Sequence, residues 1–174
     1  KKARRPVPRV LPMHPARPLL AVCSAALTLQ AADTIRLESP DRTWVASVAT
    51  GPALTLELRD ADGTLAIAQE IGLATNAGAV PAPGSAVTGH QGRSVDTTVD
   101  PPVRQKAARL RDRFNEETIA FADGTKLVVR LYDEGLAYRF VTANAGALSV
   151  VAETRVCRFA DDPLVYFGAE DKGF

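Results

Sequence analysis

Residues 112–140 read DRFNEETIAFADGTKLVVRLYDEGLAYRF, and this stretch decides the fold that we predict for the chain. Its apolar residues recur at every second position in three runs, as Leu127, Val129 and Leu131 do in the second run. A period of two places such side chains on one face of a β-strand. Asp-Gly and Asp-Glu-Gly separate the runs, and glycine supplies the positive φ that a tight hairpin needs. We therefore expect a three-stranded antiparallel meander.

The same alternation recurs on both sides of this stretch. Leu54, Leu56 and Leu58 alternate with polar residues and lead into the turn sequence DADG at 60–63. Further strand-like runs occur at 34–37, 44–50, 95–99, 148–152 and 155–159. About ten short strands with little helix predict an all-β fold, an antiparallel β-sandwich. A chain of 174 residues has room for one such domain with its own core.

Two stretches depart from the alternation. Residues 76–92 are rich in Ala, Gly, Pro and Ser, so we expect a mobile surface loop with little to bury. Residues 103–113 form the one helix-like segment and carry five basic residues. We interpret this segment as a solvated charged face. The alternative, a basic patch for an anionic partner, is weakened by the acidic residues Asp112, Glu116 and Glu117 that follow.

Residues 1–32 resemble an export signal. They hold six basic residues and no acidic one, followed by an apolar run at 19–29 that is too short to span a bilayer. Met13 is the expected initiator, and 33–174 the expected mature domain, located in the periplasm or secreted. The alternative is a short buried helix. Without this leader the chain has 15 basic and 20 acidic residues, a balance that does not favour nucleic acid as a partner.

The sequence carries few signs of its own chemistry. It has no glycine-rich phosphate loop, no Gly-x-Ser-x-Gly, no His-x-x-His and no Cys-x-x-Cys. His90 lies in the expected loop, where a solvated role is typical, and Cys157 is expected to be a small apolar strand residue. Asp123 and Asp133 lie in the predicted turns, where aspartate bonds the local backbone. The residues alone thus predict an exported all-β domain without a self-contained active site.

Four segments carry a resemblance to a known family: LESPD at 37–41, RSVDTT at 93–98, RFNE at 113–116 and RLYDEGLAYRF at 130–140. In this order they resemble the N-terminal domain of glycoside hydrolase family 97, a group of exported bacterial α-glucosidases and α-galactosidases. The resemblance runs from about residue 35 to about residue 166 and implies a β-supersandwich like that of galactose mutarotase. Between Asp96 and Asn115 the family usually has two Trp and a Gly-Glu, which this chain lacks.

This resemblance implies a non-catalytic domain that packs on a (β/α)8 catalytic barrel and shapes its sugar pocket, where glutamates hold a calcium ion. The N-terminal domain of the family supplies one of these glutamates, from a position that aligns beyond Phe174. Glu170 is the nearest alternative in this chain. Asn115 and Glu116 are the motif residues expected to face the pocket. The alternative is that Asn115 bonds backbone and Glu116 is solvated. This chain alone is expected to have no cofactor and no catalytic residue.

A second function remains open at this point, that of a free-standing exported carbohydrate-binding module. Such modules stack exposed aromatic rings on sugars, and the candidates here include Trp44, Tyr132, Tyr138 and Tyr166. Most of these residues fall at positions that the alternation assigns to the core, so the glycosidase domain is the preferred interpretation.

Overall fold

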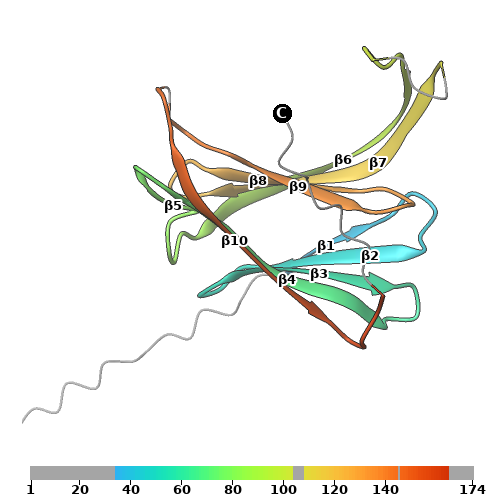
Figure 1. Ribbon diagram of the computed structural model, residues 1–174, viewed down its shortest axis with the longest axis horizontal. Coiled ribbons are helices and arrows are strands. Elements are labelled where there is room, and N and C mark those ends of the chain that lie inside the picture. The colour runs from blue at the N-terminus through green and yellow to red at the C-terminus, as the bar shows by residue number, and fades with distance from the viewer. Residues whose placement is uncertain (1–33, 104–107, 145, 165–174) are drawn as a thin grey trace, which may run out of the picture.

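The computed structural model describes residues 34–103, 108–144 and 146–164, and these form two antiparallel β-sheets that face each other (Figure 1). The described residues contain strands and turns but no helix, which confirms the predicted all-β sandwich. Consequently none of the described segments is a helix that could cross a membrane. The predicted leader at 1–32 and Glu170 lie outside the described residues.

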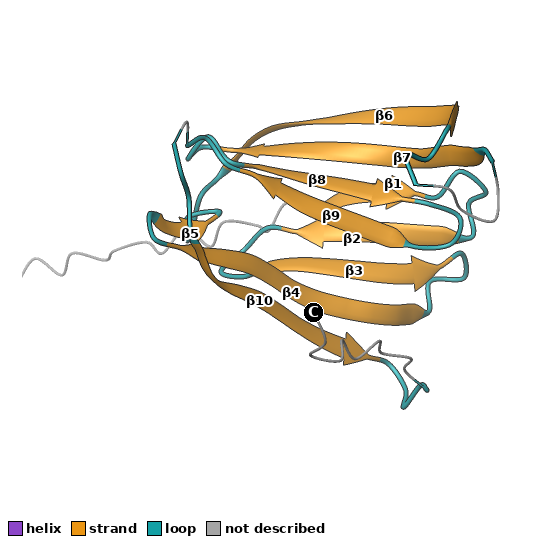
Figure 2. Cartoon of the chain, turned by 45° about the horizontal axis from the view of Figure 1, so that its top comes forward, coloured by secondary structure: helices purple, strands orange, loops and turns teal. Residues whose placement is uncertain are grey.

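The first sheet, sheet A, contains the N-terminal strands and the last strand of the chain. Its order is β1 (Thr34–Glu38), β2 (Trp44–Ala49), β3 (Leu54–Asp60), β4 (Leu65–Thr75) and β10 (Val150–Phe159), and the short β5 (Gly78–Val80) also pairs with β4. The first four strands are joined by short turns. In contrast, β10 returns from far along the chain to lie along β4 at the sheet edge (Figure 2).

The second sheet, sheet B, contains β6 (Val87–Val99), β7 (Leu110–Phe121), β8 (Lys126–Leu131) and β9 (Leu136–Val141) in chain order. The last three strands are the predicted meander, which is confirmed, with Ile119 directly opposite Leu127. In the β7–β8 turn Gly124 has a φ of 81°, and the backbone N–H of Gly124 donates to the carbonyl of Phe121. Glycine is favoured there because a Cβ is strained at positive φ.

The core lies between the two sheets and follows the alternation seen in the sequence. Ile119, Phe121, Leu127 and Val129 of sheet B are at most 4 % exposed. They pack on inward-facing residues of sheet A, which are Ile35, Val48, Leu54, Leu56 and Ile71. Tyr138 and Phe140 of β9 pack against this cluster, as the alternation predicted. Burial of these side chains is the main force that holds the two sheets together.

Two expectations are wrong in part, because backbone pairing overrides composition. Within the expected loop at 76–92, residues 78–80 form β5 and residues 87–92 begin β6, which pairs with β7 along its whole length. Almost every β6 residue is exposed. The low apolar content of this segment therefore predicted its low burial correctly, but it did not mean that the segment lacks a strand. Of the expected helix at 103–113, residues 110–113 begin β7, and 104–107 lie outside the described residues. Of the late runs at 148–152 and 155–159, residues 150–152 and 155–159 belong to one strand, β10.

Candidate functional site

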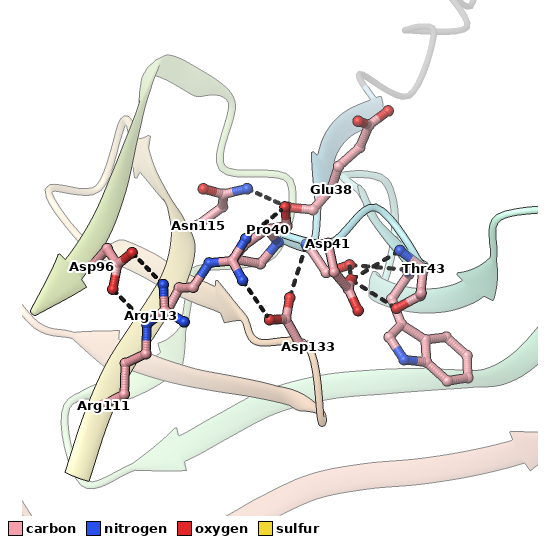
Figure 3. Close-up of polar contacts among 11 residues, drawn as sticks. Glu38, Pro40, Asp41, Thr43, Asp96, Arg111, Arg113, Asn115 and Asp133 are labelled. Atoms are coloured by element: carbon pink, nitrogen blue, oxygen red, sulfur yellow. Dashed lines mark hydrogen bonds and ion pairs between the residues drawn. The ribbon is translucent and has the colours of Figure 1, made fainter. Parts of the chain in front are cut away.

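The four segments that carried the family resemblance meet at one end of the sandwich (Figure 3). The β1–β2 turn lies there beside the start of β7 and the β8–β9 turn. The backbone N–H of Asp41 donates to Oδ1 of Asp133 at 2.9 Å, across 92 positions of sequence. We call this group the turn cluster and define it as Glu38, Ser39, Pro40, Asp41, Thr43, Ser94, Asp96, Arg111, Arg113, Asn115 and Asp133.

The β1–β2 turn is organised around Ser39, which is 1 % exposed. Its hydroxyl donates to Oδ1 of Asp41 at 2.6 Å and accepts the backbone N–H of Trp44 at 3.0 Å. Oδ1 of Asp41 also accepts the backbone N–H and the hydroxyl of Thr43. Hydrogen bonds to the ionised carboxylate favour it over the protonated form. The bond from Ser39, followed by those from Thr43, therefore lowers the pKa of Asp41 to about 2.

This low pKa predicts a loss of stability in acid. Because the pKa of Asp41 is about 2 in the folded chain and its ordinary value is 3.8, ionised Asp41 stabilises the fold above pH 3.8 and ceases to do so as the pH falls toward 2. Asp41→Asn should lower the melting temperature at pH 6, and the gap to wild type should narrow between pH 4 and pH 2. Circular dichroism melts check this, with Asp62→Asn in the exposed β3–β4 turn as control. A gap that is constant with pH would contradict it.

Arg113 connects the two sheets at this end. Its Nη2 donates to the carbonyl of Pro40 at 3.1 Å, and its Nη1 lies 3.3 Å from Oδ2 of Asp133. Asp133 thus receives bonds from both sheets and has long-range partners, whereas only local bonding was expected of it. Asp123 accepts the backbone N–H and the hydroxyl of Thr125, as the local expectation required. However, its Oδ2 also accepts the backbone N–H of Ala82 at 2.7 Å, 41 positions away, so its bonding is not local alone.

Asn115 uses both ends of its amide within the turn cluster. Its Nδ2 donates to the carbonyl of Glu38 at 2.7 Å, and its Oδ1 accepts the hydroxyl of Ser94 at 2.6 Å. The predicted alternative, that Asn115 bonds backbone, is confirmed. Asn115 also lines a surface hollow of about 460 Å³, together with Glu38, Ser39, Pro40, Arg42, Ser94, Val95, Asp96 and Arg113.

Asp96 and Arg111 form a bidentate ion pair at the rim of this hollow, with N–O distances of 2.8 and 2.6 Å. The hydrogen bonds from Arg111 lower the pKa of Asp96. Both side chains are more than half exposed, so solvent screens the pair and its contribution to stability is small. The pair orients two charged groups outward at the edge of the site.

Glu116 lies on the face of β7 opposite to that of Asn115, since successive residues of a strand point to opposite sides. It is 5 % exposed, and each carboxylate oxygen accepts one arginine Nε at 2.6 Å, from Arg93 and Arg130. The bonds from Arg93 and then Arg130 lower the pKa of Glu116 although burial acts to raise it. The alternative that Glu116 is solvated is therefore wrong. Arg130 also lies 4.2 Å above the ring of Phe114.

Sequence reasoning missed the pair formed by His90 and Glu117. His90 lies in β6, not in a loop, and its Nδ1 is 2.6 Å from Oε1 of Glu117. The His90 side chain is 56 % exposed, whereas that of Glu117 is 9 % exposed. Gly92 lies opposite Glu117, and a Cβ built on Gly92 would come within 2.7 Å of the Glu117 carboxylate. No signal in the sequence could have found this pair, because the placement of Gly92 beside Glu117 becomes visible only once the strand register is known.

No group of three or more His, Cys, Asp or Glu side chains with metal-binding geometry occurs among residues 34–103, 108–144 and 146–164. Cys157 lies in a strand as expected, but it is exposed and therefore not a packing residue. The described residues thus form an all-β domain with a polar, hydrogen-bonded end.

Comparison with known proteins also identifies an all-β domain of a known family. Residues 37–173 match the family model described as Glycosyl-hydrolase 97 N-terminal. The match covers most of the chain, and the chain belongs to this family. A retaining alpha-galactosidase of Bacteroides thetaiotaomicron is 28 % identical over 144 residues, which are 83 % of this chain and 22 % of the relative.

Two groups of solved structures share the fold. A beta-arabinopyranosidase superimposes with a TM-score of 0.62 at 21 % identity, covering 72 % of this chain and 21 % of its own. A glycoside hydrolase family 97 enzyme from Pseudoalteromonas sp. was solved with panose and with acarbose. It superimposes with a TM-score of 0.59 at 18 % identity, and the match covers 70 % of this chain and 20 % of the enzyme. The chain therefore spans about a fifth of the length of the relatives that it matches.

Proposed function

We propose that this domain is non-catalytic and uses the turn-cluster end to pack on a separate catalytic (β/α)8 barrel and shape its sugar pocket. The whole enzyme would act on an α-glucoside or an α-galactoside after export. The observation that carries the proposal is the convergence of the four family-like segments. They are spread over about a hundred residues of sequence. Three of them line one polar hollow, and the fourth joins them through Asp133, which bonds Asp41 and Arg113.

The chemistry of the hollow supports this role. Asn115, Arg113 and Asp133 are bonded within the domain and so hold the turns in place. Arg42 lines the hollow on the exposed β1–β2 turn, and its backbone N–H bonds the carbonyl of Ser39. A fixed frame with an outward cation matches a docking surface that contributes to a neighbouring pocket. The relatives, by their names, are glycosidases about five times as long as the matched region.

Calcium is part of the proposal only at the level of the whole enzyme. Calcium takes six to eight oxygen ligands, several of them carboxylates. The described residues offer no such group, so they do not fit a calcium site by themselves. Glu170 stays a candidate ligand outside the described residues. Our proposed role for the domain does not depend on it.

The first experiment is to read the gene past the codon of Phe174, where we expect a (β/α)8 barrel. An unrelated coding sequence would contradict the proposal. In the protein that contains both parts, Arg42→Ala should lower kcat/KM for nitrophenyl α-galactoside or α-glucoside about tenfold, which corresponds to about 1.4 kcal/mol of transition-state stabilisation. Arg36→Ala is the matched control, because Arg36 is exposed on β1 but does not line the hollow. Equal activity of the two variants would count against the assigned face.

A further inference from the structure

The face of sheet B that points away from the core carries a cluster of arginine side chains. Glu116 of β7 lies on this face, directly opposite Arg93 of β6 on one side and Arg130 of β8 on the other. Arg139 of β9 is two positions from Ala137, the residue opposite Arg130, and therefore lies on the same face. Three guanidinium groups thus surround one carboxylate, which is 5 % exposed.

Arg130 is held in place from two sides. Its Nε donates to Oε2 of Glu116 at 2.6 Å, and its guanidinium lies 4.2 Å from the centre of the Phe114 ring. Phe114 is 2 % exposed, and the ring of Tyr132 packs on it with a centroid distance of 5.1 Å. Because the Nε–H is directed to Glu116, the Nη groups, which carry the other guanidinium donors, can bond a further partner. A side chain that is already ordered loses little entropy on binding.

Arg130, Tyr132 and Arg139 line a hollow of about 170 Å³ on this face, and none of its lining residues is acidic. Val128 also lines it and is 6 % exposed. Because Arg139 lies directly opposite Val128, it is a diagonal neighbour of Arg130, and long side chains in that relation can reach the same group. The hollow has room for several water molecules, and hence for a carboxylate or a phosphate group.

The charges of the cluster favour an anion in this hollow. Glu116 accepts bonds from both Arg93 and Arg130. Arg139 has no acidic partner among residues 34–103, 108–144 and 146–164. One carboxylate does not balance three guanidinium groups, and like charges on one face of a sheet repel each other. A bound oxyanion removes that repulsion, and the planar guanidinium group suits carboxylate and phosphate because it can donate two parallel hydrogen bonds.

We propose that the hollow formed by Arg130, Tyr132 and Arg139 binds the oxyanion group of a small ligand, a carboxylate or a phosphate. Glu116 is a positioning residue, because it holds Arg130 in place without lining the hollow. Tyr132 supplies a hydroxyl donor. This inference does not depend on the proposed function, because none of these residues belongs to the turn cluster.

Titration of the isotope-labelled full chain, followed by NMR, tests the site with three compounds. Sodium glucuronate supplies a carboxylate, inorganic phosphate supplies a phosphate, and galactose is the neutral control. The ionic strength is kept constant, because salt screens exposed charges. We expect saturable shifts of the Arg130 and Arg139 resonances with at least one anion, at a Kd of about 1 mM, and none with galactose. The anion that binds identifies the group. Saturation by neither anion, or an equal response to galactose, would overturn the proposal.

Variants separate a built site from general attraction between charges. Arg139→Gln should raise the Kd about tenfold, the effect of losing one charge-assisted hydrogen bond. Arg36→Gln is the matched control, because Arg36 is exposed on β1 and does not line the hollow, so the Kd should stay unchanged. Equal affinity of these two variants would overturn the proposal.

Glu116→Gln gives a second readout, which net charge alone would not produce. This change makes the face more positive, yet it should weaken binding, because Arg130 loses the carboxylate that orients it. Circular dichroism checks that the variant is folded, and if it is not, the comparison of Arg139→Gln with Arg36→Gln decides. Stronger binding by folded Glu116→Gln would show attraction by net charge alone and would overturn the proposed site.

Discussion

Replacing Ile119 by alanine is expected to lower the free energy of unfolding by about 2–5 kcal/mol, the range for removing a large buried aliphatic side chain. Ile119 is fully buried and belongs to the cluster between the two sheets. It lies in the middle of β7 and directly opposite Leu127 of β8, in the centre of the meander. Neighbours held in two sheets on both sides cannot collapse freely into the space left by the lost atoms, so a cavity remains.

Urea unfolding followed by the fluorescence of Trp44, the single tryptophan, measures this loss. Val141→Ala is the matched control, because Val141 is 39 % exposed at the end of β9. We expect the control to change the free energy of unfolding by about 0.5 kcal/mol or less. A loss below about 1 kcal/mol for Ile119→Ala would show that the cluster between the sheets does not support the fold in the way described.

The second large effect is expected for Ser39→Ala, at about 1–3 kcal/mol of unfolding free energy. The Ser39 hydroxyl is buried, accepts the backbone N–H of Trp44 and donates to Asp41. Alanine would leave that N–H without its side-chain acceptor. A buried polar group that loses its partner costs more than the mean value of a hydrogen bond. The variant also removes the largest cause of the low pKa of Asp41.

Ser85→Ala makes the same chemical change in an exposed contact, since the Ser85 hydroxyl accepts the backbone N–H of Asp123 at 3.2 Å. Water can replace that bond, so we expect a loss of about 0.5 kcal/mol or less. Chemical unfolding at pH 7 compares the two variants. If Ser39→Ala and Ser85→Ala were equally mild, the buried hydroxyl would not be the organising group of the β1–β2 turn.

The meander could be predicted because its signals are local. The alternation from Leu127 to Leu131 and the Asp-Gly turn lie within a few residues of each other, and each points to the same hairpin. β6 was less accessible to prediction. Its backbone pairs with β7 over twelve positions while its side chains stay in solvent, so composition carried little information.

The sequence allowed only a partial prediction of the candidate site. Asn115 and Glu116 could be singled out by resemblance, but their opposite roles follow from the strand alternation and from partners that are remote in sequence. Asp41 and Asp133 are 92 positions apart, and Glu116 meets Arg93 and Arg130 only through the register of three strands. No local sequence pattern predicts these long-range contacts, because they depend on strand register and on how the two sheets are placed together.

The position of β10 has a consequence for synthesis on the ribosome. Sheet B is built from consecutive strands, so its hairpins can form as soon as each one emerges. In sheet A, in contrast, β10 pairs with β4 only when Phe159 reaches Ile67, and closing a long loop carries an entropic penalty that delays such a contact. The nascent chain therefore exposes the β4 edge until the residues of β10 have left the exit tunnel. We expect chaperones that bind extended apolar segments to engage the chain during that interval.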